Sequence, residues 1–443
     1  MEDKKLSVGQ IVSVSLMLFA MFFGAGNMIF PPMVGHMAGT SYIKAVLGFI
    51  TTDAGLSILG IAAVVFCGSH LRDIGNLIGP KFSVGLGLAI YLLIGPLFAL
   101  PRTGTVSYAM AVQPLLSGSH GIMPSFIFTF LFFSLTFVLC LNPSKVVDIV
   151  GKVLTPVLLL AIAAIFVQSL MHPVGTIVAP NAEYAQIPFF KGFIKGYLSL
   201  DGIASLAFAI VVIESIKSMG VKSTRGIINY TLICGVFAGV ALGAVYLALG
   251  FVGAQTSSGF KVDDGGQLLA QVVDVQMGTA GIIVLGIAVV LACLTTSIGL
   301  STSFAGYINE LKPQWSYRKV LLAVILFSFA ISNVGLKTMI TVTLPALVMI
   351  YPPVMALVIL SFFRKKIGDN KEAYILAVLF AFIVGIFDGI KTITGDLGAV
   401  GEFLNGYLPF YSMGIGWIIP SLVGVFIGML PFVNFAEKKK DNI

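Results

Sequence analysis

Long apolar segments recur along the chain, separated by short stretches that carry most of the charged and turn-forming residues. A helix of about 20 apolar residues crosses the roughly 30 Å hydrocarbon core of a membrane. Segments of about that length cover residues 8–34, 42–68, 83–113, 124–141, 146–171, 192–216, 222–253, 277–309, 317–334, 338–362, 373–392 and 411–435. The pattern predicts an all-α polytopic membrane protein with about twelve transmembrane helices.

Composition excludes a water-soluble globule. Of the 443 residues, 58% are hydrophobic and only 10% are charged, which is too little polar side chain to cover a soluble fold. The first apolar segment is too long for a cleaved signal peptide and is expected to be the first span. The four cysteines and four histidines stand singly, so neither a metal site nor a disulfide framework is expected.

Basic residues are unevenly divided between the two predicted faces. If the amino terminus lies inside, 19 of the 26 Lys and Arg residues fall in loops and tails on the inner face. Because basic residues are retained on the cytoplasmic side of short loops, both termini are expected in the cytoplasm. Basic loops beside an anionic lipid leaflet also explain the net charge of +7 without nucleic acid.

The first apolar segment is interrupted by FFGAGNMIFPP at residues 22–32. Non-helical backbone at membrane depth survives only where it is buried or lines a cavity, because unpaired backbone groups are costly in hydrocarbon. Gly24 and Gly26 do not share a helical face, and Pro31 and Pro32 show that lost hydrogen bonds are tolerated here. We therefore expect a broken helix; close helix packing at the glycines is the alternative.

The sixth segment carries a second interruption. Asp201 and Gly202 are poor residues for a helix interior, and they stand beside Ser199 in an apolar run. Asp201 could simply be the N-cap of a new helix, but a broken helix with freed carbonyls is also expected. Segments one and six are five apart, and broken helices at corresponding positions of two halves indicate an inverted-repeat transporter with a site near the membrane midplane.

This spacing divides the chain into three parts. Residues 1–190 would form the first repeat with helices one to five, and residues 191–366 the inverted second repeat with helices six to ten. Residues 367–443 would add two further helices and a cytoplasmic tail.

The eighth segment concentrates six hydroxyl side chains between Thr295 and Ser303. Ala292, Thr295 and Thr296 stand at positions i, i+3 and i+4, which brings one carbonyl and two hydroxyls to the same side of a helix. Carbonyls released by the break after Ala20 could complete a shell of hard oxygens suited to a weakly held sodium ion. The alternative is that most of these hydroxyls bond to carbonyls of their own helix.

Three motifs together resemble those of a known family. FFGAGNMIFPP, LPRTGTVSYAM and GYLSLDGIASLAFAIVV are similar to the signatures of the bacterial branched-chain amino acid cation symporters (LIVCS family, BrnQ type). More distantly, GNMIFPP and ACLTTSIG resemble helices one and eight of the LeuT-fold transporters. The resemblance implies a five-plus-five inverted repeat with two additional helices. It also implies uptake of leucine, isoleucine and valine through the bacterial cytoplasmic (inner) membrane, driven by sodium or protons.

The resemblance also implies a set of site residues. Sodium would be held by the carbonyls of Ala20, Phe23 and Ala292 and the hydroxyls of Thr295 and Thr296. The substrate carboxylate would meet backbone N–H groups at the positive end of the second half-helix. The residues expected around the substrate are Gly24, Ala25, Gly26, Asn27, Ser199, Leu200, Ala204 and Phe208, with Val106 and Ile298 as further apolar candidates.

Other positions bear on which ion is coupled to transport and on how many ions bind. Asn27 could cap the second half-helix or ligate an ion, and Tyr197 stands where distant relatives place a threonine of a second sodium site, so one sodium is expected. Charged residues inside spans are expensive and are functional candidates by default. They are Asp53, Arg102, Asp201, Glu214 and Asp388. Glu214 is expected to reach the cytoplasmic interface near Lys217 and to act as an anchor there, and a coupling proton would be carried by Asp53 or Asp201.

The expected function is sodium-coupled symport of branched-chain amino acids by alternating access, with no organic cofactor. A proton-coupled symporter of another small neutral amino acid is the alternative, and an ion-conducting channel is a less favoured one. An enzyme is not expected, because the sequence lacks HExxH, GxSxG and paired-carboxylate signatures. The sequence leaves the oligomeric state open.

Overall fold

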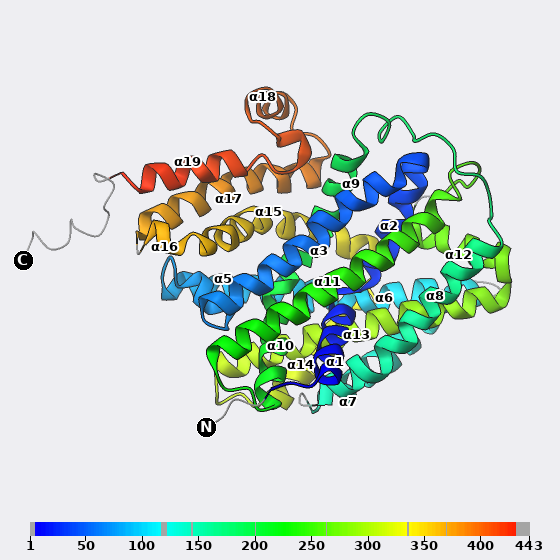
Figure 1. Ribbon diagram of the computed structural model, residues 1–443, viewed down its shortest axis with the longest axis horizontal. Helices are drawn as coiled ribbons and strands as arrows, with labels where there is room; N and C mark the ends of the chain where they lie inside the picture. Colours follow the sequence, from blue (N-terminus) through cyan, green and yellow to red (C-terminus); the bar gives the residue numbers. More distant parts are fainter. Residues whose placement is uncertain are drawn as a thin grey trace, which may run out of the picture.

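A computed structural model shows a helical protein (Figure 1). The structure describes residues 5–116, 122–142, 145–199, 201–262, 264–334, 336–368 and 370–430, with the backbone only at 336–340, 342 and 343. No β-strand occurs in these ranges. The all-α prediction is therefore confirmed.

Most of the helices follow the predicted apolar segments. The longer ones are α1 (Val8–Phe22), α2 (Ala25–Ala38), α3 (Tyr42–Cys67), α5 (Pro80–Leu92), α6 (Ala99–Ala111), α7 (Ile122–Cys140), α8 (Thr155–Met171), α9 (Pro188–Tyr197), α10 (Asp201–Ser218), α11 (Thr224–Ala254), α12 (Gly265–Met277), α13 (Thr279–Leu311), α14 (Tyr317–Ser332), α15 (Leu336–Phe362), α17 (Lys371–Thr394) and α19 (Ile418–Gly428). Short helical pieces are η1 (Gly39–Ser41), α4 (Leu71–Gly75), η2 (Leu93–Leu97), η3 (Gln113–Leu115), η5 (Val147–Leu154), α16 (Arg364–Ile367), α18 (Ala399–Tyr407) and η6 (Tyr411–Met413).

The structure does not test the predicted count of twelve spans. Within the described ranges, eight helical segments are long and apolar enough to cross a membrane, or nine if the bent pair α9 and α10 forms one span. The helices α1 and α19 are apolar but shorter. A multi-pass helical membrane protein is thus confirmed, while the count of twelve stays a prediction.

The outer helices present large apolar side chains to their surroundings. Exposed examples on α7, α8, α11 and α19 are Phe130, Leu131, Leu160, Val240 and Phe426. Such a surface would be costly in water, and in a bilayer it faces lipid chains of the same polarity.

The first span is broken as predicted. Helix α1 ends at Phe22, Phe23 leaves the helical region with ψ 80°, and α2 starts at Ala25. The side-chain oxygen of Asn27 accepts a hydrogen bond from the Gly24 N–H at 3.3 Å and so caps the new helix. Two prolines lie inside α2. The break therefore lies at the glycine motif.

The sixth span is also interrupted, because α9 and α10 meet at an angle of 50°. Asp201 is the first residue of α10. The predicted repeat boundary near residue 190 falls inside α9, and the division into repeats stays a prediction.

The third span carries a kink that the sequence analysis missed. Gly95, inside η2, has non-helical backbone angles of φ −86° and ψ −115°, and Pro96 follows it. The kink separates α5 from α6 and sets the direction in which α6 leaves.

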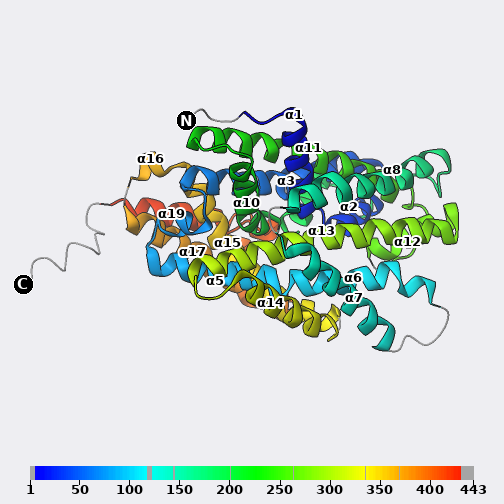
Figure 2. The ribbon, with the colours of Figure 1, turned by 90° about the horizontal axis from the view of Figure 1, so that it is seen from below.

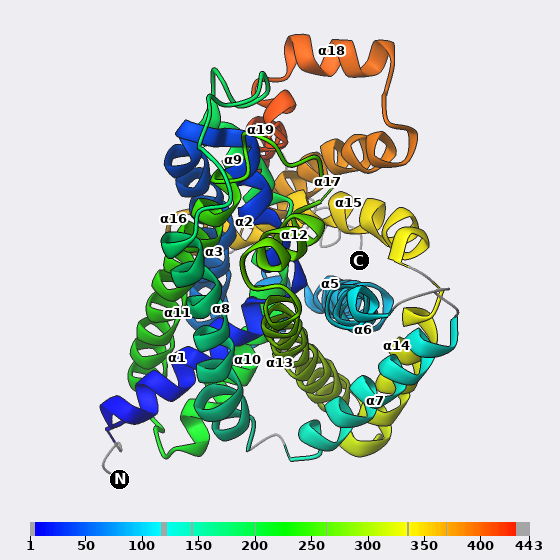
Figure 3. The same ribbon diagram turned by 90° about the vertical axis from the view of Figure 1, so that its right-hand side faces the viewer.

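The broken helices pack against several other helices. Helix α1 contacts α10, α11 and α13, and α10 also contacts α3 and α13 (Figures 2 and 3). Helices α15, α17 and α19 pack together on one side, and α18 stands apart from the bundle (Figure 1). The residues at the first break, Phe23, Ala25 and Asn27, are accordingly buried.

Candidate functional site

A cavity of about 80 Å³ lies at the two breaks. Seven of the eight predicted substrate residues line it: Gly24, Ala25, Gly26, Asn27, Ser199, Ala204 and Phe208. Leu200 lies outside the described residues. Much of the remaining wall is apolar and is formed by Met21, Phe22, Ile94, Phe98, Ala99, Leu300 and Leu347. The structure thus brings residues of α2, α6, α10 and α13 to one small, mostly apolar space.

The glycines at the start of α2 lack side chains, so neighbouring side chains and a ligand in the cavity can come close to the backbone. A Cβ atom added to Gly24 would lie 3.0 Å from the Thr296 hydroxyl oxygen. One added to Gly26 would lie 3.4 Å from the Phe30 ring and 3.9 Å from Nη2 of Arg102. The first N–H groups of a helix have no partner within that helix and favour an anion, so the start of α2 is suited to a carboxylate.

Three of the five predicted cation residues, Ala20, Ala292 and Thr295, are in contact at the end of α1. The Thr295 hydroxyl donates to the Ala20 carbonyl at 2.8 Å and is 3.0 Å from the Ala292 carbonyl. The Thr296 hydroxyl donates to the Met21 carbonyl at 3.1 Å. Phe23 is the C-cap of α1, and neither threonine hydroxyl bonds to its carbonyl. Carbonyl and hydroxyl oxygens from α1 and α13 therefore converge, which is the donor set expected for a sodium ion.

The hydroxyl-rich part of α13 uses both bonding modes considered from the sequence. Thr302 bonds to the carbonyls of Ile298 and Gly299 on its own helix. Thr295, Thr296 and Ser297 instead reach other helices, and Ser297 bonds to Thr136 at 3.3 Å. Bonding to carbonyls of α13 therefore accounts for only some of the hydroxyl side chains on this helix.

A buried polar network that the sequence analysis did not find runs beside the cavity. The Asn27 amide donates to the Asp201 carboxylate at 2.6 Å and to the Tyr246 hydroxyl at 2.6 Å. That hydroxyl donates to the Asp53 carboxylate at 2.5 Å. Asn27 thus caps α2 and also bonds to residues of α10 and α11, and Tyr246 extends the network to α3. Capping therefore accounts for only one of the contacts of Asn27.

Arg102 of α6 also lines the cavity. Its guanidinium lies 5.7 Å from the centre of the Phe98 ring, a cation–π contact. Asp53 contacts Tyr246 and makes no ion pair with Arg102 among the described residues. Asp53 and Arg102 therefore do not neutralise each other by forming an ion pair.

The other sequence candidates lie elsewhere. Val106 and Ile298 are buried, but neither lines the cavity. The Tyr197 hydroxyl accepts a hydrogen bond from the Trp417 indole at 2.9 Å. Asp388 lines a separate cavity of about 210 Å³ together with Tyr197.

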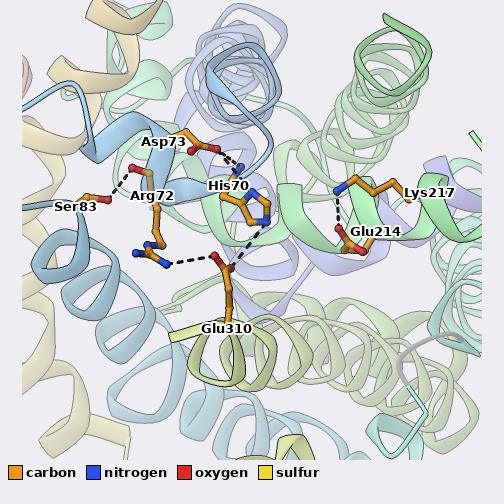
Figure 4. Close-up of polar contacts among 7 residues, drawn as sticks. All are labelled: His70, Arg72, Asp73, Ser83, Glu214, Lys217 and Glu310. Carbon is orange, nitrogen blue, oxygen red and sulfur yellow. Dashed lines mark hydrogen bonds and ion pairs between the residues drawn. The ribbon is translucent and has the colours of Figure 1, made fainter. Parts of the chain in front are cut away.

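Charged residues form a cluster at the end of the bundle where α13 terminates. Figure 4 shows Glu310 between His70 and Arg72, at 3.9 and 3.5 Å. Glu214 pairs with Lys217 at 2.8 Å. A cavity of about 550 Å³ adjoins the cluster and is lined by His70, Glu214 and Glu310. This end of the bundle is therefore joined by weak, partly exposed ion pairs.

Comparison with solved structures supports the fold. The structure of MhsT in complex with L-phenylalanine aligns with a TM-score of 0.52 and 15% identity over 97% of this chain and all of that one. MHP1, a nucleobase-cation-symport-1 family transporter, aligns with a TM-score of 0.59 and 12% identity over 97% of this chain and 95% of that one. The predicted LeuT-like class of fold is thus confirmed.

Sequence comparison gives the family. The chain is 41% identical to the branched-chain amino acid permease BraB of Bacillus subtilis over 438 residues, which cover 99% of this chain and 98% of that one. It is 34% identical to the permease BrnQ of Escherichia coli over 426 residues, with 95% of each chain covered. These relatives are permeases and not enzymes. The model of the branched-chain amino acid transport protein family matches residues 7–434, and the chain belongs to this family.

Proposed function

We propose that the protein imports leucine, isoleucine and valine by sodium-coupled symport through alternating access. It would lie in the bacterial cytoplasmic membrane with both termini in the cytoplasm. The observation that carries the proposal is the position of the broken helix. The last turn of α1 contacts hydroxyls of α13, while the start of α2 lines the cavity.

The substrate would lie across the two breaks. Its carboxylate would meet the N–H groups of Ala25 and Gly26, and its ammonium would face the interrupted backbone at Ser199 and Leu200. The branched side chain would pack on Ala204 and Phe208. An apolar pocket separates ligands that differ by one methylene by only about 1–3 kcal/mol, so the three amino acids should compete.

Sodium would occupy the contact between α1 and α13. It would be held by the carbonyls of Ala20, Phe23 and Ala292 and by the hydroxyls of Thr295 and Thr296. An ion there would order the end of α1 and hence the backbone that meets the substrate. Because such coupling is reciprocal, leucine should raise sodium affinity as much as sodium raises leucine affinity.

A proton-coupled symporter of another small neutral amino acid is the second candidate. The network of Asp53, Tyr246, Asn27 and Asp201 favours it, because two carboxylates in one buried network could exchange a proton. An ion-conducting channel is the least favoured possibility.

Counterflow in proteoliposomes tests the carrier mechanism. Vesicles loaded with unlabelled leucine should transiently accumulate external labelled leucine, and isoleucine and valine should compete while lysine and glutamate do not. A carrier exchanges substrate in this way, whereas a channel only equilibrates it. Equilibration without overshoot would contradict the proposal.

A further inference from the structure

Two side chains of opposite charge face the same small cavity from different helices. Arg102 comes from α6, which follows the kink at η2, and Asp201 is the first residue of α10. Much of the wall around them is apolar. A charged group at membrane depth is expensive and persists where it binds something of opposite charge.

Arg102 makes no ion pair within the described part of the chain, although the Asp201 carboxyl is near enough to interact with it electrostatically. Its buried Nε atom has no hydrogen-bond partner there. The guanidinium lies over the face of Phe98, at 5.7 Å from the ring centre. A buried guanidinium that forms no ion pair leaves its hydrogen-bonding fork unused, and that fork matches a carboxylate with two parallel hydrogen bonds.

The position of Arg102 points to the same group that the start of α2 would bind. Its Nη2 atom lies 3.9 Å from where a Cβ of Gly26 would stand. The guanidinium and the positive end of α2 therefore act on one part of the cavity, and an anion there would meet both.

Asp201 supplies the opposite charge. Its Oδ2 atom accepts the amide of Asn27 at 2.6 Å, which fixes the carboxylate while the residue remains on the cavity wall. Asp53, by contrast, is only 1% exposed and does not line the cavity. Of the two carboxylates in the network, Asp201 is the one that a ligand can reach.

We propose that Arg102 and Asp201 form a charge clamp that recognises the α-carboxylate and the α-ammonium of a zwitterionic amino acid. The clamp rests on the proposed function, because it requires that the substrate is an amino acid and that Asp201 does not carry a coupling proton. It adds side-chain charges to a site otherwise built from backbone groups. It also explains how an apolar cavity distinguishes leucine from an amine or an acid with the same side chain.

Equilibrium binding of labelled leucine to the purified full-length protein at constant sodium tests the clamp. Competitors with the leucine side chain would be 4-methyl-2-oxopentanoate, which lacks the ammonium, and 3-methylbutylamine, which lacks the carboxylate. The wild type should prefer leucine to each by roughly 100-fold or more, because a site with a buried polar group rejects a ligand that leaves it unpaired.

Asp201→Asn should lower the preference for leucine over the oxo acid by at least about tenfold and leave more of the preference over the amine. Arg102→Gln should do the reverse. Asp148→Asn is the matched control, since this aspartate is exposed and pairs with Lys152 on its own helix. Arg102→Gln decides the question if Asp201→Asn fails to elute as a single species in size-exclusion chromatography.

The possible failures are distinguishable. Leucine binding by the variants with both preferences unchanged would overturn the clamp and leave the proposed function intact. No leucine binding by the folded wild type would contradict the proposed function and the clamp together.

Discussion

The hydroxyl of Thr295 on α13 donates to the carbonyl of Ala20 in the last turn of α1, at 2.8 Å. The two residues are 275 positions apart in the chain. The contact joins a continuous helix to the broken one, at the point where backbone carbonyls are released. An ion bound there would act on the break itself.

Thr295→Ala should raise the sodium concentration needed for half-maximal leucine uptake by at least about tenfold, because it removes one hard-oxygen ligand. Thr302→Ala is the matched control on the same helix, since Thr302 bonds only to carbonyls of α13. Initial uptake rates across a sodium series give the comparison. Equal sodium dependence in the two variants would remove Thr295 from the site.

Gly24→Ala should weaken leucine binding, because the added Cβ would lie 3.0 Å from the Thr296 hydroxyl and would push the start of α2 away from α13. Gly9→Ala on α1 is the control, since a Cβ there has open space around it. The dissociation constant should rise by about tenfold or more in the first variant only. Equal affinities would mean that this glycine merely permits the turn.

Tyr246→Phe should destabilise the protein by about 1–3 kcal/mol, because Asn27 and Asp53 each lose a buried hydrogen-bond partner. Tyr184→Phe makes the same chemical change at a buried hydroxyl without a recorded partner, and should have little effect. Thermal unfolding in detergent compares the two. Equal melting temperatures would show that the network contributes nothing to stability.

Glu310→Gln should loosen the end of the bundle where α13 meets His70 and Arg72. A Ser218→Cys reporter in the adjoining cavity, in a background without Cys67, should then react faster with a thiol reagent. The rate should rise only a few-fold, because partly exposed ion pairs contribute about 0.2–1 kcal/mol. Glu214→Gln is the control, since Glu214 pairs within its own helix, and equal rates would argue against a closing role for Glu310.

Much of the fold follows from local sequence. The length of the apolar segments predicted the membrane-spanning helices. The two glycines Gly24 and Gly26 and the double proline after them predicted a break, because these residues do not favour a continuous helix. Gly95 and Pro96 carried the same signal at the kink of the third span, but it was not recognised there.

The polar network could not be predicted in the same way. Tyr246 lies in an apolar stretch of α11, and its contacts with Asn27 and Asp53 span 219 and 193 positions. A single tyrosine has no periodic pattern, and its partner depends on how the helices pack. The same holds for Arg102, whose place beside Gly26 depends on the direction of α6 after the kink.

The central claim is that sodium bound between α1 and α13 drives the uptake of branched-chain amino acids. The most direct test is labelled leucine uptake into proteoliposomes under an imposed sodium gradient and under a proton gradient of equal size. We predict concentrative uptake with sodium alone, and its loss in Thr295→Ala at low sodium. Uptake driven by the proton gradient without sodium would contradict the claim and assign the coupling to Asp53 or Asp201.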